Sequence, residues 1–319
     1  MKRKVIIATK QIRIVSGVNS FIDDFINLFS SRLEIEKIES RKWFKVISKE
    51  SLIYWHDFYS INLVLFLVFN WKYNRSIIIV SHGSFILTDW TKKYLLKKAY
   101  MCLVKILSTD KVRFQYLSSE EYNASFKFTN FFISAPCLES AERMIVKDRH
   151  KYKIENRRIE FLYISALSYE RKGFDRLYKF IEDLTNTNIE FNFRIVGAEL
   201  RDFQDYPEFL KLKNVEIFGR LSRSSIPALL ETVDYVCLFS RSEGFPISLL
   251  EAVNHNKAII VTKETNFFDF LDRYRLGYSL DELRDDITKL TSLPMSDFEG
   301  FRLEIFAQNR NLETLMLRA

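Results

Sequence analysis

The chain has 319 residues, with 48 Lys and Arg against 41 Asp and Glu, and 47% of its residues are hydrophobic. That length is natural for two domains, and the apolar content suffices for two cores. Its three scattered cysteines, Cys102, Cys137 and Cys237, form neither a metal-binding spacing nor a disulfide framework, so a reducing cytoplasm is expected.

The basic charge is concentrated in the first half of the chain. Residues 1–150 hold 24 Lys and Arg against 14 Asp and Glu, a net +10, whereas residues 151–319 hold 24 against 27. Such an excess fits a membrane surface, a nucleic acid or an anionic substrate. No zinc-finger or RNA-binding signature occurs, so a nucleic-acid partner is not expected. The apolar run in MKRKVIIATK is too short for a signal peptide.

The first half predicts alternating strands and helices. Val5–Ala8 is typical of a buried strand, and a loop containing Gly17 leads to a helix from about Phe21 to Leu33. Ile61–Phe69 is the most apolar stretch, but a bilayer span needs roughly 20 residues, so a core helix is predicted. Ile77–Val80 follows as another buried strand.

His82 comes just after that strand and is followed by Gly83. In a parallel sheet this position is the carboxyl end of a strand, where ligands bind. Two interpretations stay open: a loop histidine bonded to the backbone, and a histidine that contacts a ligand.

A basic helix is predicted from Asp89 to Leu107. Its lysines alternate with Tyr94, Leu95, Leu96, Tyr100, Leu103 and Val104, and they are Lys92, Lys93, Lys97, Lys98 and Lys105. The pattern fits a helix lying on anionic lipid, or a solvated lysine face over a core stripe.

Further along the chain, Phe131–Ser134 looks like the last strand of the first half, and the hydrophilic stretch 147–158 is the predicted link. The second half opens with a strand over Glu160–Ser165. Strands are also predicted at Phe193–Gly197 and Val215–Gly219, and a short helix at Ile226–Leu230.

The most informative stretch is FSRSEGFPISLLEAVNHNKAIIV, from Phe239 to Val261. An apolar strand, Tyr235–Phe239, precedes the polar loop, and Pro246 suits the first turn of the helix that follows. The helix start offers free backbone N–H groups and the positive end of a dipole, which favour a phosphate or diphosphate. Glu243 and Glu251 frame this site. Without the surrounding motif they would be read as solvated residues of an ordinary βαβ unit.

Ser-Glu-Gly-Phe-Pro followed by Leu-Glu-Ala resembles the signature of retaining family-four glycosyltransferases of the bacterial envelope polysaccharide type. Lys172, Gly173 and Asp175 match that family's Lys-Gly-x-Asp pattern, and Ser118–Glu121 resembles its helix-opening Ser-Glu-Glu-Glu stretch. The resemblance is dense over residues 160–280 and thinner over residues 1–140. It implies an α/β protein of the GT-B fold, with two Rossmann-like domains facing across a cleft and a final helix returning to the first domain.

The resemblance also implies roles for residues. Glu251 would bind ribose hydroxyls, and Glu243 with the backbone of Phe245 and Pro246 would hold the transferred sugar. Lys172 and the helix start at Ile247 would take the diphosphate, and His82 would contact the donor sugar and the acceptor side. The remaining donor-site positions by resemblance are Gly17, Gly219, Arg220 and Gly244, and Arg171 is added as the neighbour of Lys172.

One departure from the family pattern affects the diphosphate site. Ala166 stands where the family has an arginine. We expect Arg171, Arg241 or Arg13 to supply the second cation, because an arginine forms bidentate bonds to phosphate. A non-catalytic GT-B subunit and a membrane-associated scaffold remain the alternatives.

The resulting expectation is a metal-independent hexosyltransferase without a cofactor, since no Asp-x-Asp pair follows a strand. It would move a sugar with retention from a nucleotide-sugar to a surface glycan or lipid-linked acceptor, for lipopolysaccharide, O-antigen or capsule. The expected domains are residues 1–150, residues 151–300 and a returning helix over 301–319. A cytoplasmic location is expected, with peripheral contact to the anionic inner membrane.

Overall fold

The computed structural model describes residues 2–10, 17–45, 51–86, 94–135, 158–165, 171–199, 203 and 211–318. The chain divides into two compact units. The first unit is Met1–Arg143 with Glu304–Ala319, and the second is Met144–Leu303. The predicted boundary at residue 150, and residues 147–157 of the predicted link, lie outside the described residues.

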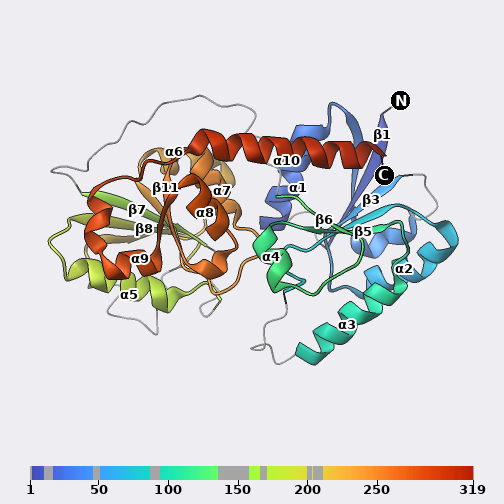
Figure 1. The fold of residues 1–319 in the computed structure, drawn as a ribbon, viewed down its shortest axis with the longest axis horizontal. Coiled ribbons are helices and arrows are strands. Elements are labelled where there is room, and N and C mark those ends of the chain that lie inside the picture. Colours follow the sequence, from blue (N-terminus) through green and yellow to red (C-terminus); the bar gives the residue numbers. More distant parts are fainter. Residues whose placement is uncertain are drawn as a thin grey trace. The chain divides into compact units, whose positions relative to one another are not determined.

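In the first unit, the described strands form one parallel sheet in the order β2-β1-β3-β4-β5-β6 (Figure 1). Chain order reverses between β1 and β3, and the carboxyl ends at such a switch point form the usual ligand site of an open α/β sheet. The strands are β1 (Arg3–Thr9), β2 (Leu33–Glu39), β3 (Leu52–Trp55), β4 (Ile77–Val80), β5 (Val112–Tyr116) and β6 (Phe131–Ile133).

Helices and large aromatic side chains complete this unit. Trp55, Phe66, Phe85 and Phe114 belong to one buried cluster. The sheet and its helices shield this cluster, since a parallel sheet buries both of its faces. The helices are α1 (Gly17–Phe29), η1 (Ser40–Lys45), α2 (Ile61–Tyr73), α3 (Tyr94–Leu107) and α4 (Ser119–Ala124).

The second unit has a parallel sheet in the order β12-β11-β10-β7-β8-β9. This is the Rossmann order, with its switch point between β7 and β10. The strands are β7 (Ile159–Ile164), β8 (Phe191–Val196), β9 (Val215–Ile217), β10 (Tyr235–Leu238), β11 (Ala258–Val261) and β12 (Gly277–Ser279).

The helices of the second unit follow its strands, as parallel connections require. They are α5 (Phe174–Thr185), η5 (Arg223–Ser225), α6 (Ile226–Glu231), α7 (Ile247–Asn254), η6 (Lys263–Thr265), α8 (Phe268–Tyr274), α9 (Leu280–Asp285) and η7 (Ile287–Thr291). The two parallel sheets with their helices confirm the predicted fold class.

The last helix, α10 (Phe298–Arg318), begins in the second unit and ends in the first. Within the first unit, Glu313 accepts a hydrogen bond of 2.6 Å from Arg32, and Leu312 and Met316 are fully buried. The predicted terminal helix is therefore present and is fixed by its apolar face.

Three element predictions need correction. The helix predicted from Phe21 to Leu33 begins at Gly17 and ends at Phe29, because Leu33 already belongs to β2. The core helix predicted at Ile61–Phe69 runs to Tyr73 and buries only one side. Helix α3 packs on the core through Met101 and Val104, with Tyr100 and Leu107 partly buried, whereas Leu95, Leu96 and Leu103 of the predicted core stripe are exposed.

Candidate functional site

Two loops meet at the switch point of the second unit. The loop after β10 carries Ser240 and Glu243, and the segment that precedes α5 carries Arg171 and Lys172. The Arg241 N–H donates to the Arg171 carbonyl over 2.8 Å, and the Tyr163 hydroxyl donates to the Lys172 carbonyl over 2.6 Å. These bonds fix the backbone of Arg171 and Lys172 beside the Glu243 loop.

Gly173 makes this close approach possible. Its φ of 67° lies in the left-handed region, where residues with a Cβ are strained. A Cβ at this position would lie 2.0 Å from the Phe239 carbonyl oxygen. Glycine is therefore required by both the backbone angle and the available space.

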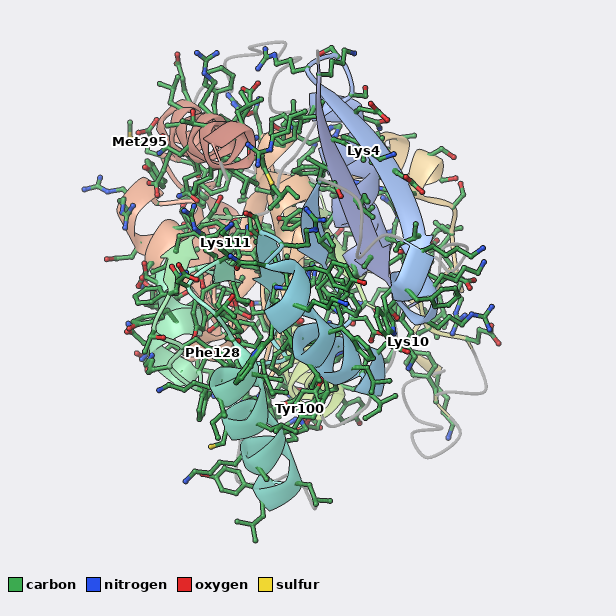
Figure 2. The ribbon with its side chains drawn as sticks, turned by 90° about the vertical axis from the view of Figure 1, so that its right-hand side faces the viewer. Lys4, Lys10, Tyr100, Lys111, Phe128 and Met295 are labelled. Carbon is green, nitrogen blue, oxygen red and sulfur yellow. The ribbon has the colours of Figure 1, made fainter. Side chains whose placement is uncertain are left out.

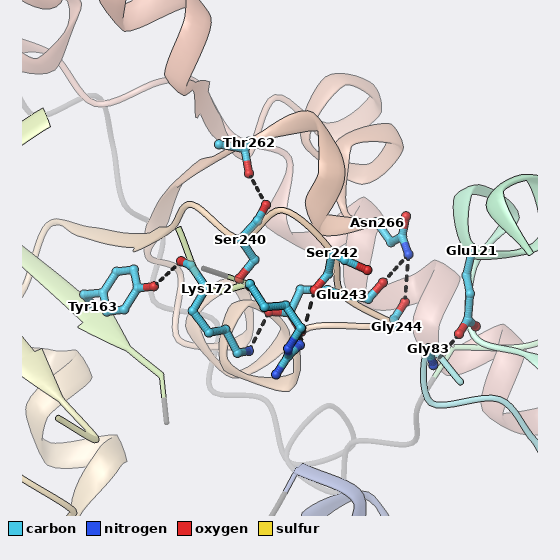
Figure 3. Close-up of polar contacts among 11 residues, drawn as sticks. Gly83, Glu121, Tyr163, Lys172, Ser240, Ser242, Glu243, Gly244, Thr262 and Asn266 are labelled. Atoms are coloured by element: carbon cyan, nitrogen blue, oxygen red, sulfur yellow. Dashed lines mark hydrogen bonds and ion pairs between the residues drawn. The ribbon is translucent and has the colours of Figure 1, made fainter. Parts of the chain in front are cut away.

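Glu243 is the centre of a buried polar cluster (Figure 3). Its side chain is only 9% exposed. Lys172 Nζ donates to Glu243 Oε1 over 2.5 Å, and Ser240 Oγ donates to the same oxygen over 2.6 Å. Arg171 Nη1 lies 3.4 Å from Glu243 Oε2 and donates to the Ser242 carbonyl over 3.2 Å.

The charges of this cluster favour an anionic ligand. Burial lowers the pKa of the Lys172 ammonium, while the Glu243 carboxylate opposes that shift. With Lys172 and Arg171 charged, two cations face one carboxylate. The surplus positive charge in a poorly solvated place suits a phosphate or diphosphate.

Asn266 fixes the backbone after Glu243. Its Nδ2 donates to the Glu243 carbonyl and lies 3.4 Å from the Gly244 carbonyl. Phe245 and Pro246 are buried, and α7 begins at Ile247 with Pro246 as its N-cap. Pro246 thus lies one position before the helix, whereas the sequence suggested its first turn.

Glu251, on α7, is paired rather than simply solvated. Arg223 donates to Glu251 Oε1 through Nε at 3.0 Å, and Arg223 Nη2 lies 2.9 Å from the same oxygen. Both contacts fall on one carboxylate oxygen. No motif singles out Arg223 in the sequence, where it stands just before a short helix.

The structure distinguishes the three arginines considered for the second cation. Arg171 joins Lys172 at Glu243, whereas Arg241 forms a two-bond pair with Asp175, at 2.7 and 2.5 Å. Arg13 and Ala166 lie outside the described residues. Gly219, with φ of 64°, and the exposed Arg220 follow β9, and no described contact joins either to Glu243 or Glu251.

A second polar group occupies the switch point of the first unit. Nδ1 of His56, just after β3, lies 2.7 Å from Nε2 of His82, just after β4. The ring of Phe21 meets both imidazoles, at centroid distances of 5.4 and 5.2 Å. Burial lowers the pKa of His82 to about 3 and that of His56 well below its usual value. Both rings are therefore neutral near pH 7.

Glu121 determines the shape of the loop that carries His82. Its carboxylate accepts bonds of 2.6 Å from Ser81 Oγ, the Gly83 N–H and the Leu117 N–H. Figure 3 shows the bond from Gly83. His82 has φ of 43°, a conformation that a non-glycine residue adopts only under restraint. Glu121 supplies that restraint from the start of α4. Gly17, the remaining predicted position in this unit, begins α1.

One protein family matches the sequence of the second unit. Residues 145–288 match the family of glycosyl transferases group 1. This match contains Lys172, Glu243 and Glu251.

One similar protein is the N,N'-diacetylbacillosaminyl-diphospho-undecaprenol alpha-1,3-N-acetylgalactosaminyltransferase of Campylobacter jejuni, 26% identical over 257 residues. The alignment covers 75% of this chain and 58% of that protein, so the chain spans little more than half of the relative's length.

Two solved structures share the GT-B fold over nearly the whole chain. Anabaena HepE, solved with UDP, has a TM-score of 0.69 at 15% identity, covering 99% of each chain. The sucrose-phosphate synthase of Thermosynechococcus elongatus has a TM-score of 0.70 at 10% identity, covering 98% of each chain.

Sequence reasoning missed His56, Arg223 and Asn266, and it left Glu121 without a role. His56 had a usable signal: it directly follows a short apolar strand, as His82 follows β4 after one residue. Among the described residues, no three His, Cys, Asp or Glu side chains gather as a metal site would require. Metal independence stays a prediction.

Proposed function

We propose that the protein is a glycosyltransferase that moves a sugar from a nucleotide-sugar to a bacterial surface glycan or lipid-linked acceptor. The observation that carries this proposal is the convergence of Lys172 and Arg171 on Glu243, at the switch point of a segment matching glycosyl transferases group 1. Ligands of open α/β sheets bind at this place.

The donor would be held by charge and by hydroxyl recognition. Lys172, Arg171 and the amino end of α7 would bind the diphosphate, and Glu251 would accept bonds from the ribose hydroxyls. Glu243 and the backbone of Phe245 and Pro246 would hold the transferred sugar. His82, as a neutral imidazole, would contact the donor sugar and the acceptor side.

The reaction is an acetal exchange at the anomeric carbon. The bond from that carbon to the diphosphate oxygen breaks, and its electron pair leaves with the diphosphate. The acceptor hydroxyl attacks from the leaving-group face, which retains configuration, and its proton passes to the departing diphosphate. Lys172 and Arg171 stabilise the charge that grows on this leaving group, so the step needs neither a metal nor a protein nucleophile.

The acceptor would be a glycan carried on a lipid diphosphate, as for lipopolysaccharide, O-antigen or capsule. The Campylobacter relative is named for such an acceptor, a diphospho-undecaprenol. The basic first half fits an enzyme that works at the cytoplasmic face of an anionic membrane. The UDP bound by HepE makes uridine nucleotides the first donors to test.

The decisive experiment is a thermal-shift screen with nucleotide-sugars, followed by assays of donor hydrolysis and transfer. Stabilisation by one nucleotide class, with turnover of its sugar, supports the proposal. A protein that binds a nucleotide but neither hydrolyses nor transfers would be a non-catalytic subunit. If it binds none while Ala166→Arg restores binding, the site is a relic.

A further inference from the structure

Helix α2 has two apolar sides. One side contributes Leu63, Phe66 and Leu67 to the buried core. The other carries Ile61, Leu65, Val68, Phe69 and Trp71, all exposed, with Trp71 at 63%. The spacing of Ile61, Leu65, Val68 and Phe69 places them on one outer face. A helix that is apolar on both sides is unusual in water, because its second side has nothing to pack against.

Helix α3 repeats this pattern on the neighbouring element. Only Met101 and Val104 are buried, whereas Leu95, Leu96, Leu103 and Ile106 are exposed by 42 to 77%. Trp71 Nε1 donates to the Leu107 carbonyl over 2.9 Å, which joins the ends of the two helices. In Figure 2 the lower end of α3, beyond the labelled Tyr100, projects away from the rest of its unit.

The exposed apolar residues of α2 and α3 are called here the outer apolar surface. Monomeric proteins rarely expose so many large apolar side chains together, and such patches mark interaction sites. The two helices carry only basic charges, and in the adjoining η1 Arg41 and Lys42 are ion-paired with Glu39. Every charged residue of η1, α2 and α3 is basic: Arg41, Lys42, Lys45, Lys72, Lys97, Lys98 and Lys105.

We propose that the outer apolar surface inserts into an anionic lipid bilayer, with the surrounding lysines on the headgroups. Apolar side chains at the headgroup boundary with Lys on the flanks are the pattern of an interfacial helix, and Trp prefers that depth. A second copy of the chain is a poorer occupant, because a two-fold contact would place these lysines against each other. None of the described helices is long and apolar enough to cross a bilayer.

This surface deepens the proposed function by naming the membrane contact, and it changes the expected mode of contact. A lysine-only attachment would dissociate in high salt, since salt screens surface charge. Insertion of leucines and phenylalanines resists salt, because it depends on apolar area removed from water. Lys92 and Lys93, predicted as part of the contact, lie outside the described residues.

The test is co-flotation of the full chain with vesicles containing phosphatidylglycerol, and with vesicles of phosphatidylcholine alone. Leu95→Ser/Leu96→Ser on α3 and Leu65→Ser/Phe69→Ser on α2 probe insertion. The matched control is Met295→Ser/Leu303→Ser, which removes two apolar side chains of the second unit that are 67% and 62% exposed. Lys97→Gln/Lys98→Gln/Lys105→Gln probes the charges.

We expect the wild type and the control to bind phosphatidylglycerol vesicles at low and high salt. Each serine pair should weaken binding about tenfold or more, and the lysine variant should lower only the salt-sensitive part. Circular dichroism and the Tm show whether each variant folds. A fluorophore on the exposed Cys102, in a Cys137→Ser background, should shift to the blue on insertion.

Three outcomes overturn the inference: no vesicle binding by wild type, binding by both serine pairs equal to that of the control, or complete loss of binding in high salt. A concentration-dependent dimer that the serine pairs abolish, without vesicle binding, would assign the surface to a second copy. Transfer to a water-soluble acceptor tests the proposed function separately. The serine pairs should keep that transfer and lose transfer to a vesicle-bound acceptor.

Discussion

Lys172 and Arg171 differ in how firmly they are held at Glu243. The Lys172 side chain is 14% exposed and lies 2.5 Å from the carboxylate, whereas Arg171 is half-exposed and lies 3.4 Å away. A charged hydrogen bond in a buried place contributes about 1.5–3 kcal/mol, and an exposed one much less. Lys172 should therefore provide most of the diphosphate affinity.

We predict that Lys172→Met weakens binding of the cognate nucleoside diphosphate roughly 10- to 100-fold. Arg171→Ala should weaken it only a few-fold, about the effect of a partly exposed ion pair. Arg241→Ala is the matched control, because Arg241 is held by Asp175. Isothermal titration calorimetry gives the three dissociation constants. Equal losses of affinity in all three variants would mean that positive charge acts in general and that Lys172 and Arg171 do not bind the diphosphate specifically.

The proposed role of Glu251 can be tested by comparing a ribonucleotide with its 2′-deoxy form. If its carboxylate accepts bonds from ribose hydroxyls, Glu251→Ala should cost roughly tenfold or more in affinity for the ribonucleotide. The same change should have little effect on the 2′-deoxy ligand if that hydroxyl supplies the main bond. Calorimetry with both ligands measures the difference. A loss of the same size for both ligands would instead assign Glu251 to holding Arg223.

The pair His56 and His82 makes the stability of the first unit depend on pH. In the unfolded chain a histidine has a pKa near 6.5, whereas burial lowers the pKa of His82 to about 3 in the fold. Below about pH 6.5 the unfolded chain binds protons that the fold excludes, so the free energy of unfolding falls, by at most about 1.4 kcal/mol per pH unit for each histidine. Burial also raises the pKa of Glu121 to about 7. Between about pH 7 and pH 4.5 the folded chain therefore binds a proton at Glu121 that the unfolded chain does not, and this contribution raises the free energy of unfolding as the pH falls.

The difference between wild type and His56→Phe isolates the histidine contribution. We expect the variant to lose less stability than wild type between pH 7 and pH 5, because one buried titratable ring is gone. Urea unfolding at the two pH values measures both losses. Identical losses would show that His56 is not held neutral by the fold.

At the scale of the element, the βα loops are the parts on which the site depends. Gly173 illustrates this dependence, because a Cβ added at this position would lie 2.0 Å from the Phe239 carbonyl oxygen. Gly219 has a similar φ, but a Cβ there would be 3.9 Å from its nearest neighbour, the Ala198 carbonyl oxygen. The two positions separate backbone strain from steric clash.

We predict that Gly173→Ala lowers the free energy of unfolding by about 3 kcal/mol or more, because strain and clash add. Gly219→Ala should cost only about 1 kcal/mol, the strain alone. Denaturant unfolding compares them. If both cost the same, the loop before α5 has room to move and does not fix Lys172 as described.

The sequence predicted strands with uninterrupted apolar runs, such as β4 and β10. It missed β2, because Leu33–Glu39 alternates with charged residues at the edge of the sheet. It also missed β3 (Leu52–Trp55), and with it His56, although this strand is as short, as apolar and as fully buried as β4. The motif residues around Glu243 could be predicted from the sequence, because they lie close together along the chain. Arg223, Asn266 and the pairing of His56 with His82 depend on tertiary contacts that no local pattern encodes.

At the scale of the whole molecule, each unit has a switch point, and each switch point carries buried polar side chains. The second unit supplies an acidic centre with cations around it, Glu243 with Lys172 and Arg171. The first unit supplies neutral groups, His56 and His82, and carries the basic excess of the chain. This division fits a donor site for a charged nucleotide in one unit and an acceptor and membrane side in the other.

The central claim is sugar transfer at Glu243, and the most direct measurement is transfer from the cognate nucleotide-sugar to a polyprenyl-diphosphate-linked acceptor by wild type and Glu243→Gln. Glutamine keeps the size of the side chain and a partner for Ser240, while it leaves Lys172 and Arg171 free for the diphosphate. We expect the variant to bind the nucleoside diphosphate at least as tightly as wild type and to transfer roughly 100-fold more slowly, within the range seen when a charge-stabilising group is lost. Transfer by the variant at the wild-type rate, or no transfer by wild type from any donor that it binds, would contradict the account.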